Sequence, residues 1–185
     1  MEILRKIYLF LLDTVQTFLI AAAVFLVIYI FLFRPFEVKG ESMYPNFYDK
    51  EYVITNLIAL RLGHPKIGDV VVFKAPPDPS RDYIKRIIGK PGDTIYVKDG
   101  SVYLNNKLLD ESSYLKPDVK TYSGQFLAED KPITVPEGYY FVMGDNRLFS
   151  SDSREWGFVK EQEIIGESML VYWPINRMRF IKNPY

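Results

Sequence analysis

One uncharged, apolar run near the N-terminus constrains this chain more than any other feature. From Val15 to Phe33 there is no charged residue, and only Gln16 and Thr17 are clearly polar. As a helix, these 19 residues would rise about 1.5 Å each and reach roughly 29 Å, close to the hydrocarbon thickness of a bilayer. A buried helix of a soluble domain is disfavoured, because no face is polar from Phe18 onward. We therefore expect one transmembrane helix.

The same run has an alternative reading as the core of a cleaved signal peptide. Such a core is usually shorter and is followed by small residues at the cleavage site. Here the small residues, Ala21 to Ala23, lie in the middle of the run, and its end reads Phe31-Leu32-Phe33-Arg34. We expect an uncleaved signal anchor within residues 1–34, followed by a separate domain over residues 35–185.

Charges on either side of the run bear on its orientation. Arg5 and Lys6 precede it, which favours a cytoplasmic N-terminus and a domain on the outer face of the cell membrane. Arg34 and Lys39 follow it closely and weaken this asymmetry. The sequence thus indicates a single-pass membrane protein whose larger part is extracytoplasmic.

The composition excludes several kinds of function. Lys and Arg number 23, as do Asp and Glu, so the chain lacks the basic surplus of a nucleic-acid-binding protein. It has no Cys, which excludes disulfides, a thiol nucleophile and cysteine-ligated zinc. Its single histidine, His64, cannot form a multi-histidine metal site. We expect no metal, no cofactor and no nucleic-acid partner.

Beyond Phe36 the pattern changes to short apolar runs and period-two alternation between turn residues, which is typical of strands. Asp99-Gly100, between two such runs, is a strong hairpin signal. We expect a loop at Pro76–Ser80 and an irregular, polar excursion at residues 111–135, within an insertion over about 99–135 that forms a small β-subdomain. The fold class is therefore mostly β. The expected strands are Glu51–Asn56, Asp69–Lys74, Asp82–Ile88, Thr94–Lys98, Ser101–Leu104, Tyr139–Met143 and Ile164–Tyr172.

Ser42 is the candidate nucleophile, in the segment Gly-Glu-Ser-Met-Tyr-Pro at residues 40–45. The glycine of this segment permits a positive φ, and the proline restrains the turn that follows. The same Gly-Glu-Ser-Met recurs at residues 166–169, but there it continues into an apolar strand without a proline. We therefore assign the second serine, Ser168, to structure.

Lys85 is the candidate base. A serine needs a base to attack a carbonyl at neutral pH, and a lysine can act as one if burial lowers its pKa. In a strand, Tyr83, Lys85 and Ile87 share one face, so apolar neighbours would keep water from the amine. The alternative is a lysine whose stem lies along a half-exposed strand while its charge stays in water.

A polar segment at residues 144–154 reads Gly-Asp-Asn-Arg-Leu-Phe-Ser-Ser-Asp-Ser-Arg. Its Asp, Asn and Ser side chains readily bond to nearby backbone, which by itself indicates a well-tied surface loop. Alternatively, its carboxylates and arginines buttress a site, with a serine hydroxyl aimed at Lys85. His64, between Gly63 and Pro65, lies in a turn-like context and is a poor candidate for catalysis.

Taken in order, these motifs resemble the bacterial type I signal peptidases. The likeness runs from the anchor to Tyr172-Trp173-Pro174 and so covers nearly the whole chain. The single anchor and the short length are similar to the Gram-positive form. The matching stretches are Ser42–Pro45, Gly68–Phe73, Tyr83–Asp93 and Gly144–Arg147, followed by Ser150, Asp152, Ser153 and Arg154.

The resemblance implies a membrane-anchored, mostly β serine endopeptidase that removes signal peptides from exported preproteins after a small-x-small motif. It implies Ser42 as the nucleophile, Lys85 as the general base and Ser150 as the hydroxyl that orients the lysine. The implied partners are signal peptides, the lipid bilayer and the secretion machinery. The implied supporting residues are Gly40, Arg86, Asp145, Arg147, Asp152 and Arg154. The implied substrate-binding residues are Phe36, Val38, Met43, Tyr83 and Ile84.

Three departures from the usual pattern of this family are visible. Asn46-Phe47 replaces a usual Thr-Leu, and Leu148-Phe149 replaces residues that are commonly polar. Gly40 stands where some relatives carry a serine whose hydroxyl helps to bind the oxyanion. Only backbone N–H groups are then left for that task, and the N–H of Ser42 is the best candidate.

Two other functions fit parts of the sequence. A related Ser–Lys autoprotease of the SOS-repressor kind would share the β-fold, but the anchor and the lack of a DNA-binding region argue against it. A non-catalytic, membrane-anchored β-domain that binds partner proteins would explain the anchor. It would not explain why Ser42, Lys85 and Ser150 occur together.

Overall fold

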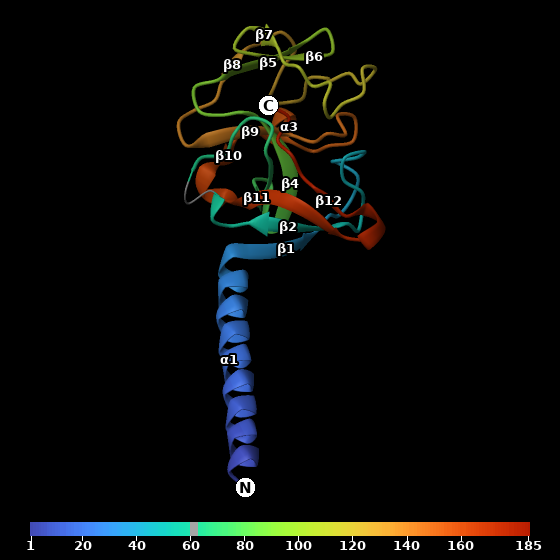
Figure 1. The fold of residues 1–185 in the computed structure, drawn as a ribbon. Coiled ribbons are helices and arrows are strands. Elements are labelled where there is room, and N and C mark those ends of the chain that lie inside the picture. The colour runs from blue at the N-terminus through green and yellow to red at the C-terminus, as the bar shows by residue number, and fades with distance from the viewer. Residues whose placement is uncertain (60–62) are drawn as a thin grey trace. The chain divides into compact units, whose positions relative to one another are not determined.

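The structure is a computed structural model of the chain and describes residues 1–59 and 63–185. It separates into two compact units, Met1–Arg34 and Pro35–Tyr185. The first unit is essentially one helix, and the second is built mainly of strands (Figure 1).

The first unit consists of the helix α1, Glu2–Leu32, of 31 residues. It begins well before the apolar run that predicts it, because the Leu, Ile, Arg and Lys residues that precede the run are also compatible with a helix. Most of its large apolar side chains from Ile3 to Val27 are exposed, as suits a helix surrounded by lipid. Among the described residues, one helical stretch, Glu2–Val27, is long and apolar enough to cross a membrane. A membrane anchor is therefore plausible by length and composition.

The second unit is organised around a sheet with the strand order β1-β2-β11-β3-β4-β9-β10, and β12 pairs with β11 (Figure 1). The pairs β2–β11, β3–β11, β3–β4 and β4–β9 are antiparallel. Because β4 has a partner on each side, its second half is buried, and this half carries Lys85. The strands are β1 (Phe33–Glu37), β2 (Tyr52–Asn56), β3 (Val70–Ala75), β4 (Asp78–Gly89), β9 (Tyr139–Met143), β10 (Val159–Lys160), β11 (Ile164–Trp173) and β12 (Arg179–Phe180).

A smaller sheet has the order β7-β6-β5-β8, with strands β5 (Thr94–Lys98), β6 (Ser101–Leu104), β7 (Lys107–Leu108) and β8 (Ile133–Thr134). The predicted hairpin is confirmed, since β5 pairs with β6 and both turn residues, Asp99 and Gly100, have a positive φ. This sheet starts before residue 99, and residues 109–132 between β7 and β8 contain no strand.

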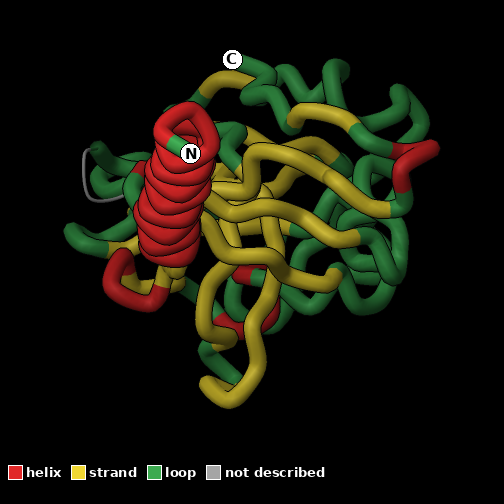
Figure 2. The backbone as a smooth tube through the Cα atoms, turned by 60° about the horizontal axis from the view of Figure 1, so that its bottom comes forward, coloured by secondary structure: helices red, strands yellow, loops and turns green. Residues whose placement is uncertain are grey.

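Outside α1, the described helical turns are short, so loops and strands make up the second unit (Figure 2). These turns are α3 (Ser153–Trp156), η1 (Glu161–Glu163) and η2 (Ile175–Arg177). The mostly β fold class is therefore confirmed. It also follows that strands and irregular segments carry most of the polar residues around the candidate site.

The expected strands are found, with shifts at their ends, but the expected loop at Pro76–Ser80 is wrong. Only Pro76 and Pro77 form the turn, and β4 begins at Asp78, which pairs with Ala75 of β3. Pro79 is tolerated in β4 because the fixed φ of proline suits an extended chain near the start of a strand. The first half of β4 thus extends an exposed hairpin with β3.

Buried apolar side chains form three clusters in the described part of the second unit. The cluster that matters most for function contains Met43 and Phe47, from the loop after β1, packed against side chains of β2, β3 and β11. It fixes the loop that carries Ser42 to the sheet. The second serine of the repeated tetrapeptide, Ser168, lies in β11 at 1% exposure, as expected for a structural residue.

Candidate active site

The loop between β1 and β2 presents Ser42. On one side of Ser42, the buried side chains of Met43 and Phe47 hold the loop against the sheet. On the other side, Gly40 has a φ of +85°, a conformation that favours glycine, and its N–H donates to Asp49 Oδ1 at 2.7 Å. The loop therefore fixes the backbone around Ser42 and leaves this serine half-buried.

Lys85 reaches Ser42 from β4. Its Nζ donates to Ser42 Oγ at 2.7 Å and to the carbonyl of Ile84 at 2.9 Å. It also lies 5.2 Å from the ring centroid of Tyr83, the apolar neighbour expected on the same face of the strand. The side chain is 4% exposed, so water has little access to the amine. The alternative of a lysine with a solvated charge is therefore excluded.

Burial has a direct electrostatic consequence for Lys85. Removal from water disfavours the ammonium and lowers the pKa of Lys85 to about 8, although the carboxylates of Asp152 and Asp145 act in the opposite direction. A neutral amine then forms in the pH range of most cells. Its lone pair can accept the proton of the Ser42 hydroxyl, to which Nζ is already hydrogen-bonded.

A cavity of about 310 Å³ opens beside these two residues. Four of the five predicted substrate-binding residues line it, Phe36, Val38, Tyr83 and Ile84. Met43 does not, because its side chain points into the core at 1% exposure. The sequence analysis missed other lining residues, namely Glu37, Lys39, Glu41, Val53, Val72, Asp82, Phe149 and Ser151.

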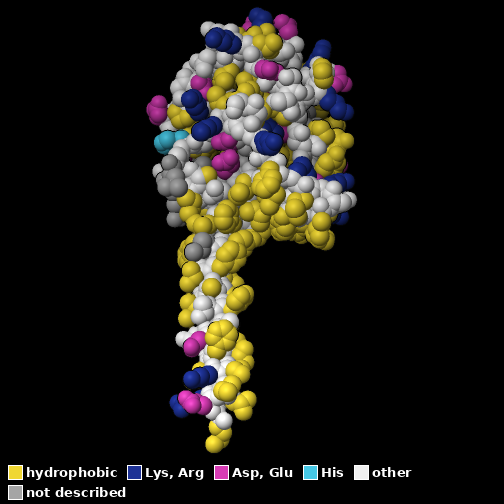
Figure 3. All heavy atoms as spheres, viewed as in Figure 1, with side chains coloured by type: hydrophobic (Ala, Val, Ile, Leu, Met, Phe, Trp, Pro, Cys, Tyr) yellow, Lys and Arg dark blue, Asp and Glu magenta, His cyan; other side chains and the backbone are white. Residues whose placement is uncertain are grey.

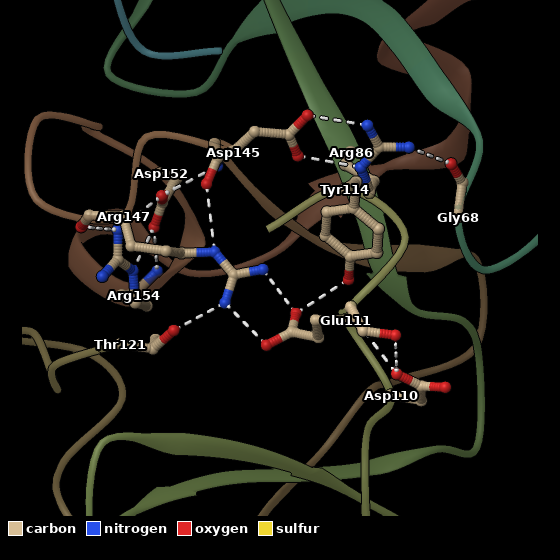
Figure 4. Close-up of polar contacts among 12 residues, drawn as sticks. Gly68, Arg86, Asp110, Glu111, Tyr114, Thr121, Asp145, Arg147, Asp152 and Arg154 are labelled. Atoms are coloured by element: carbon tan, nitrogen blue, oxygen red, sulfur yellow. Dashed lines mark hydrogen bonds and ion pairs between the residues drawn. The ribbon is translucent and has the colours of Figure 1, made fainter. Parts of the chain in front are cut away.

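Arg86, next to Lys85, makes a buried pair with Asp145 (Figure 4). Its Nε and Nη2 donate to the two carboxylate oxygens at 2.8 and 2.7 Å, and its Nη1 donates to the carbonyl of Gly68 at 2.8 Å. Asn46, from the loop that carries Ser42, donates its Nδ2 to Asp145 Oδ2 at 2.8 Å. One carboxylate therefore connects β4, the segment 144–154 and the loop of the candidate nucleophile.

Arg147 ties the same segment to residues 109–132 (Figure 4). Its guanidinium donates to both carboxylate oxygens of Glu111, at 3.0 and 2.5 Å, and to Thr121 Oγ1 at 2.6 Å. Its Nε donates to the carbonyl of Gly144 at 3.1 Å. The sequence analysis missed Glu111 and Thr121, because no local signal links a polar excursion to an arginine so far along the chain.

Asp152 and Arg154 form hydrogen bonds within the segment 144–154 and so fix its conformation. Asp152 Oδ2 accepts the N–H of Gly144 at 3.0 Å, and Arg154 donates its Nε and Nη2 to Asp152 at 2.8 Å each. Asp152 also caps α3 by accepting the N–H of Arg154. Burial acts to raise the pKa of Asp152, but the bonds and charge of Arg154 outweigh it and hold that pKa below its usual value. Asp152 is therefore a permanent negative charge near Lys85.

The segment also touches the backbone of the candidate nucleophile directly. The N–H of Asn146 donates to the carbonyl of Ser42 at 3.0 Å, and its Nδ2 donates to the carbonyl of Glu41 at 3.0 Å. A Cβ on Gly144 would lie 2.3 Å from the Ser42 carbonyl oxygen and 2.2 Å from Ser150 Oγ. Residue 144 must therefore be glycine for the two loops to approach this closely, whereas Asn146 was missed as a functional residue.

Two further candidates are placed differently. Ser150 Oγ is buried beside Gly144 and makes no hydrogen bond to the Lys85 amine, whose partners are Ser42 Oγ and the Ile84 carbonyl. The side chain of His64 is 82% exposed, bonds to Glu161 at 2.7 Å and does not line the cavity. The structure therefore brings together Ser42 and Lys85, with the arginine–carboxylate pairs around them, and leaves His64 outside.

Comparisons with known proteins show which proteins this chain is similar to. The family model described as "Signal peptidase, peptidase S26" matches residues 11–173. Signal peptidase I T of Bacillus subtilis (strain 168) is 39% identical over 170 residues, which cover 90% of this chain and 88% of that protein. Signal peptidase IB of Staphylococcus aureus (strain MRSA252) is 35% identical over 185 residues, covering 94% and 95%. A crystal structure of a signal peptidase I from Enterococcus faecalis V583 has 32% identity and a TM-score of 0.46, over 56% of this chain and 95% of that chain.

We expect Lys85 to lose its proton near pH 8, because burial lowers its pKa to about that value. In Asp152→Asn the midpoint should fall further, since the Asp152 carboxylate is the stronger of the two charges that favour the ammonium. NMR titration of isotopically labelled lysine side chains, on the full chain in detergent, measures both midpoints, and Lys85→Gln identifies the signal. A midpoint at the ordinary lysine value of 10.5 would contradict the burial argument.

Proposed function

The chain belongs to the signal peptidase family, peptidase S26, whose members are serine peptidases that cleave signal peptides from preproteins, and for that reaction we propose Ser42 as the nucleophile and Lys85 as the general base. The observation that carries this proposal is the 2.7 Å contact between Ser42 Oγ and an almost fully buried Lys85 Nζ. Geometry and lowered pKa together provide what a Ser–Lys pair needs.

The reaction then proceeds in two stages. Ser42 Oγ attacks the carbonyl carbon at the end of the signal peptide while its proton passes to the neutral Lys85 amine. The ammonium returns that proton to the departing amine of the mature protein, and an ester to Ser42 is left. Water then attacks the ester carbonyl while giving a proton to Lys85, and Lys85 passes this proton to the departing Ser42 Oγ. The signal peptide leaves with a free carboxyl end, and the Ser42 hydroxyl and the neutral Lys85 amine are restored.

The oxyanion of the first stage needs hydrogen-bond donors, and Gly40 has no side chain to supply one. The N–H of Ser42 itself has no acceptor among the described residues, which makes it available for this purpose. We assign Ser150 a positioning role, because its buried hydroxyl lies where the segment 144–154 meets the backbone of Ser42. Asp145, Arg147, Asp152, Arg154 and Arg86 act through the loops that they hold together.

The cavity beside Ser42 suits the residues that precede the cut. An extended peptide placed there would lie between residues 36–39 and β4, with Phe36, Val38 and Ile84 against its side chains. Shallow apolar walls of this kind accept Ala, Gly or Ser and exclude large side chains by overlap. This is the basis for cleavage after a small-x-small motif.

Signal peptidase I is a membrane-anchored enzyme, and α1 fits a membrane anchor. Arg5 and Lys6 support an orientation with the N-terminus in the cytoplasm and residues 35–185 on the outer face, where the secretion machinery would deliver preproteins. Hydrophobic side chains gather along one side of the second unit (Figure 3). Near the C-terminal end of the chain, four large apolar side chains are each more than half exposed, and such surface suits contact with lipid. They are Trp173, Ile175, Met178 and Phe180.

We expect Ser42→Ala and Lys85→Ala each to lower turnover by roughly a thousandfold or more, with the double variant little worse, because residues that act as one unit are not additive. Lys85→Arg should be equally inactive, since a guanidinium keeps its proton. Ser150→Ala should reduce kcat more than it changes KM.

The measurement for all of these variants is cleavage of one preprotein in detergent. His64→Ala is the control and should keep its activity; an active Lys85→Ala enzyme would remove Lys85 from the mechanism.

Replacing the Ala before the cut by Leu in a peptide substrate should nearly abolish cleavage, because we expect the part of the cavity next to Ser42 to be too shallow for the larger side chain. The measurement is kcat/KM for the pair of peptides. A matched pair with Ala or Leu at the second position before the cut is the control, and both members should be cleaved. Equal kcat/KM for Ala and Leu directly before the cut would refute the role given to the cavity.

Protease added to intact spheroplasts should digest residues 35–185, since the proposed orientation places them outside. Ser42 is nine residues beyond Phe33, a distance of at most roughly 30 Å for an extended chain, so the site is tethered close to the bilayer. Immunoblotting against each end of the chain measures the outcome, with a cytoplasmic protein as the control for lysis. Full protection of the domain in sealed cells would show the opposite orientation.

A further inference from the structure

A second cavity, of about 360 Å³, borders the loop of Ser42 on its other side. Tyr44 and Pro45, which follow Ser42 closely, form part of its wall. Leu148 lines it from the segment 144–154, and Leu115 and Val119 line it from the strandless residues 109–132. Nothing in the proposed chemistry uses this cavity.

Two chain segments pass from one cavity to the other, and they fix where the second cavity lies. In the first segment, Gly40–Ser42 line the first cavity and Tyr44–Pro45 the second. In the second segment, Phe149 lines the first cavity and Leu148 the second. The segments are joined at this transition, where the Asn146 N–H donates to the Ser42 carbonyl at 3.0 Å. The two cavities therefore lie on opposite sides of the reacting serine.

A protein substrate extends on both sides of the bond that is cut. If the end of the signal peptide occupies the first cavity, the residues after the cut must leave Ser42 in the other direction. We propose that the second cavity binds the first residues of the mature protein and accepts an apolar side chain from them. This inference rests on the proposed function and adds a site for the mature part of the substrate.

The second cavity has apolar surface that an apolar side chain can bury. Its two buried charges are already neutralised, because Asp145 is paired with Arg86 and Arg147 with Glu111. Its wall offers an occupant apolar surface from Leu148, which is 63% exposed, and from Tyr44, which is 48% exposed. The charged side chains at its rim, Lys116, Asp118 and Lys120, are exposed to water. An extended peptide advances about 3.3 Å per residue, so the second to fourth residues after the cut are in range of a wall that begins at Tyr44.

The experiment uses the full chain in detergent and peptides with one signal sequence and a four-residue mature part. Each peptide carries Leu or Ser at one of the second, third and fourth positions after the cut. For the parent enzyme we expect kcat/KM to be about tenfold higher with Leu at one of these positions, the factor expected from burying much of a leucine side chain. Leu148→Ser should reduce this preference to about twofold or less and retain the discrimination between Ala and Leu before the cut.

Leu108→Ser is the matched control, because Leu108 is 62% exposed on β7 and lines neither cavity. It should retain the tenfold preference. Equal kcat/KM for Leu and Ser at all three positions in the parent enzyme would overturn the inference and leave the proposed function intact. So would a Leu148→Ser enzyme that keeps the full preference.

A binding measurement separates the inference from catalysis. Ser42→Ala, titrated with the same fluorescently labelled peptides, should bind the preferred Leu peptide about tenfold more tightly than its Ser counterpart, and Leu148→Ser in that background should remove the difference. If the parent cleaves none of the peptides, the proposed function fails, and this titration alone decides whether the second cavity binds the mature segment. Equal affinities for the Leu and Ser peptides would then reject the site.

Discussion

The buried pair between Arg86 and Asp145 is the interaction on which the rest of the site depends. It adjoins Lys85 on β4, receives Asn46 from the loop of Ser42 and is backed by the Gly68 carbonyl. Taking two charges out of water is expensive, and only complete hydrogen bonding offsets that cost. Loss of one partner would leave a buried charge uncompensated, at a cost of roughly 3–5 kcal/mol. The pair therefore fixes the position of both proposed catalytic residues.

The carboxylates that stabilise these loops also limit how far the Lys85 pKa can fall. Burial lowers that pKa, and the charges of Asp152 and Asp145 raise it. Asp152 cannot be neutralised easily, because Arg154 and the N–H of Gly144 stabilise its charged form. The result, about 8, is low enough for a useful fraction of neutral amine and high enough for that amine to remain a strong base. The same carboxylates therefore hold the loops in place and set the pKa of Lys85.

Sequence reasoning succeeded where the signal is local. The apolar run predicted α1, and Asp99-Gly100 predicted a hairpin, because length, periodicity and turn chemistry act over a few residues. It failed where the outcome depends on distant partners. Nothing near Met43 indicates that this side chain turns into the core beside Val171 and not toward the cavity. Likewise, the expectation that Ser42 and Lys85 meet came from a resemblance between motifs, since strand pairing alone cannot be read across forty residues.

The strandless residues 109–132 illustrate how an irregular segment acquires a defined place. Glu111 and Thr121 bind the guanidinium of Arg147, and the ring of Tyr114 lies 4.3 Å from the Arg86 guanidinium carbon. Backbone hydrogen bonds, such as those from Phe126 and Leu127 to the Arg154 carbonyl, and the charges of the site loop together order this segment. Its position is thus coupled to the geometry around Ser42. A wall of the second cavity built from this segment would therefore be aligned with the nucleophile by the same ion pairs that hold the catalytic loops.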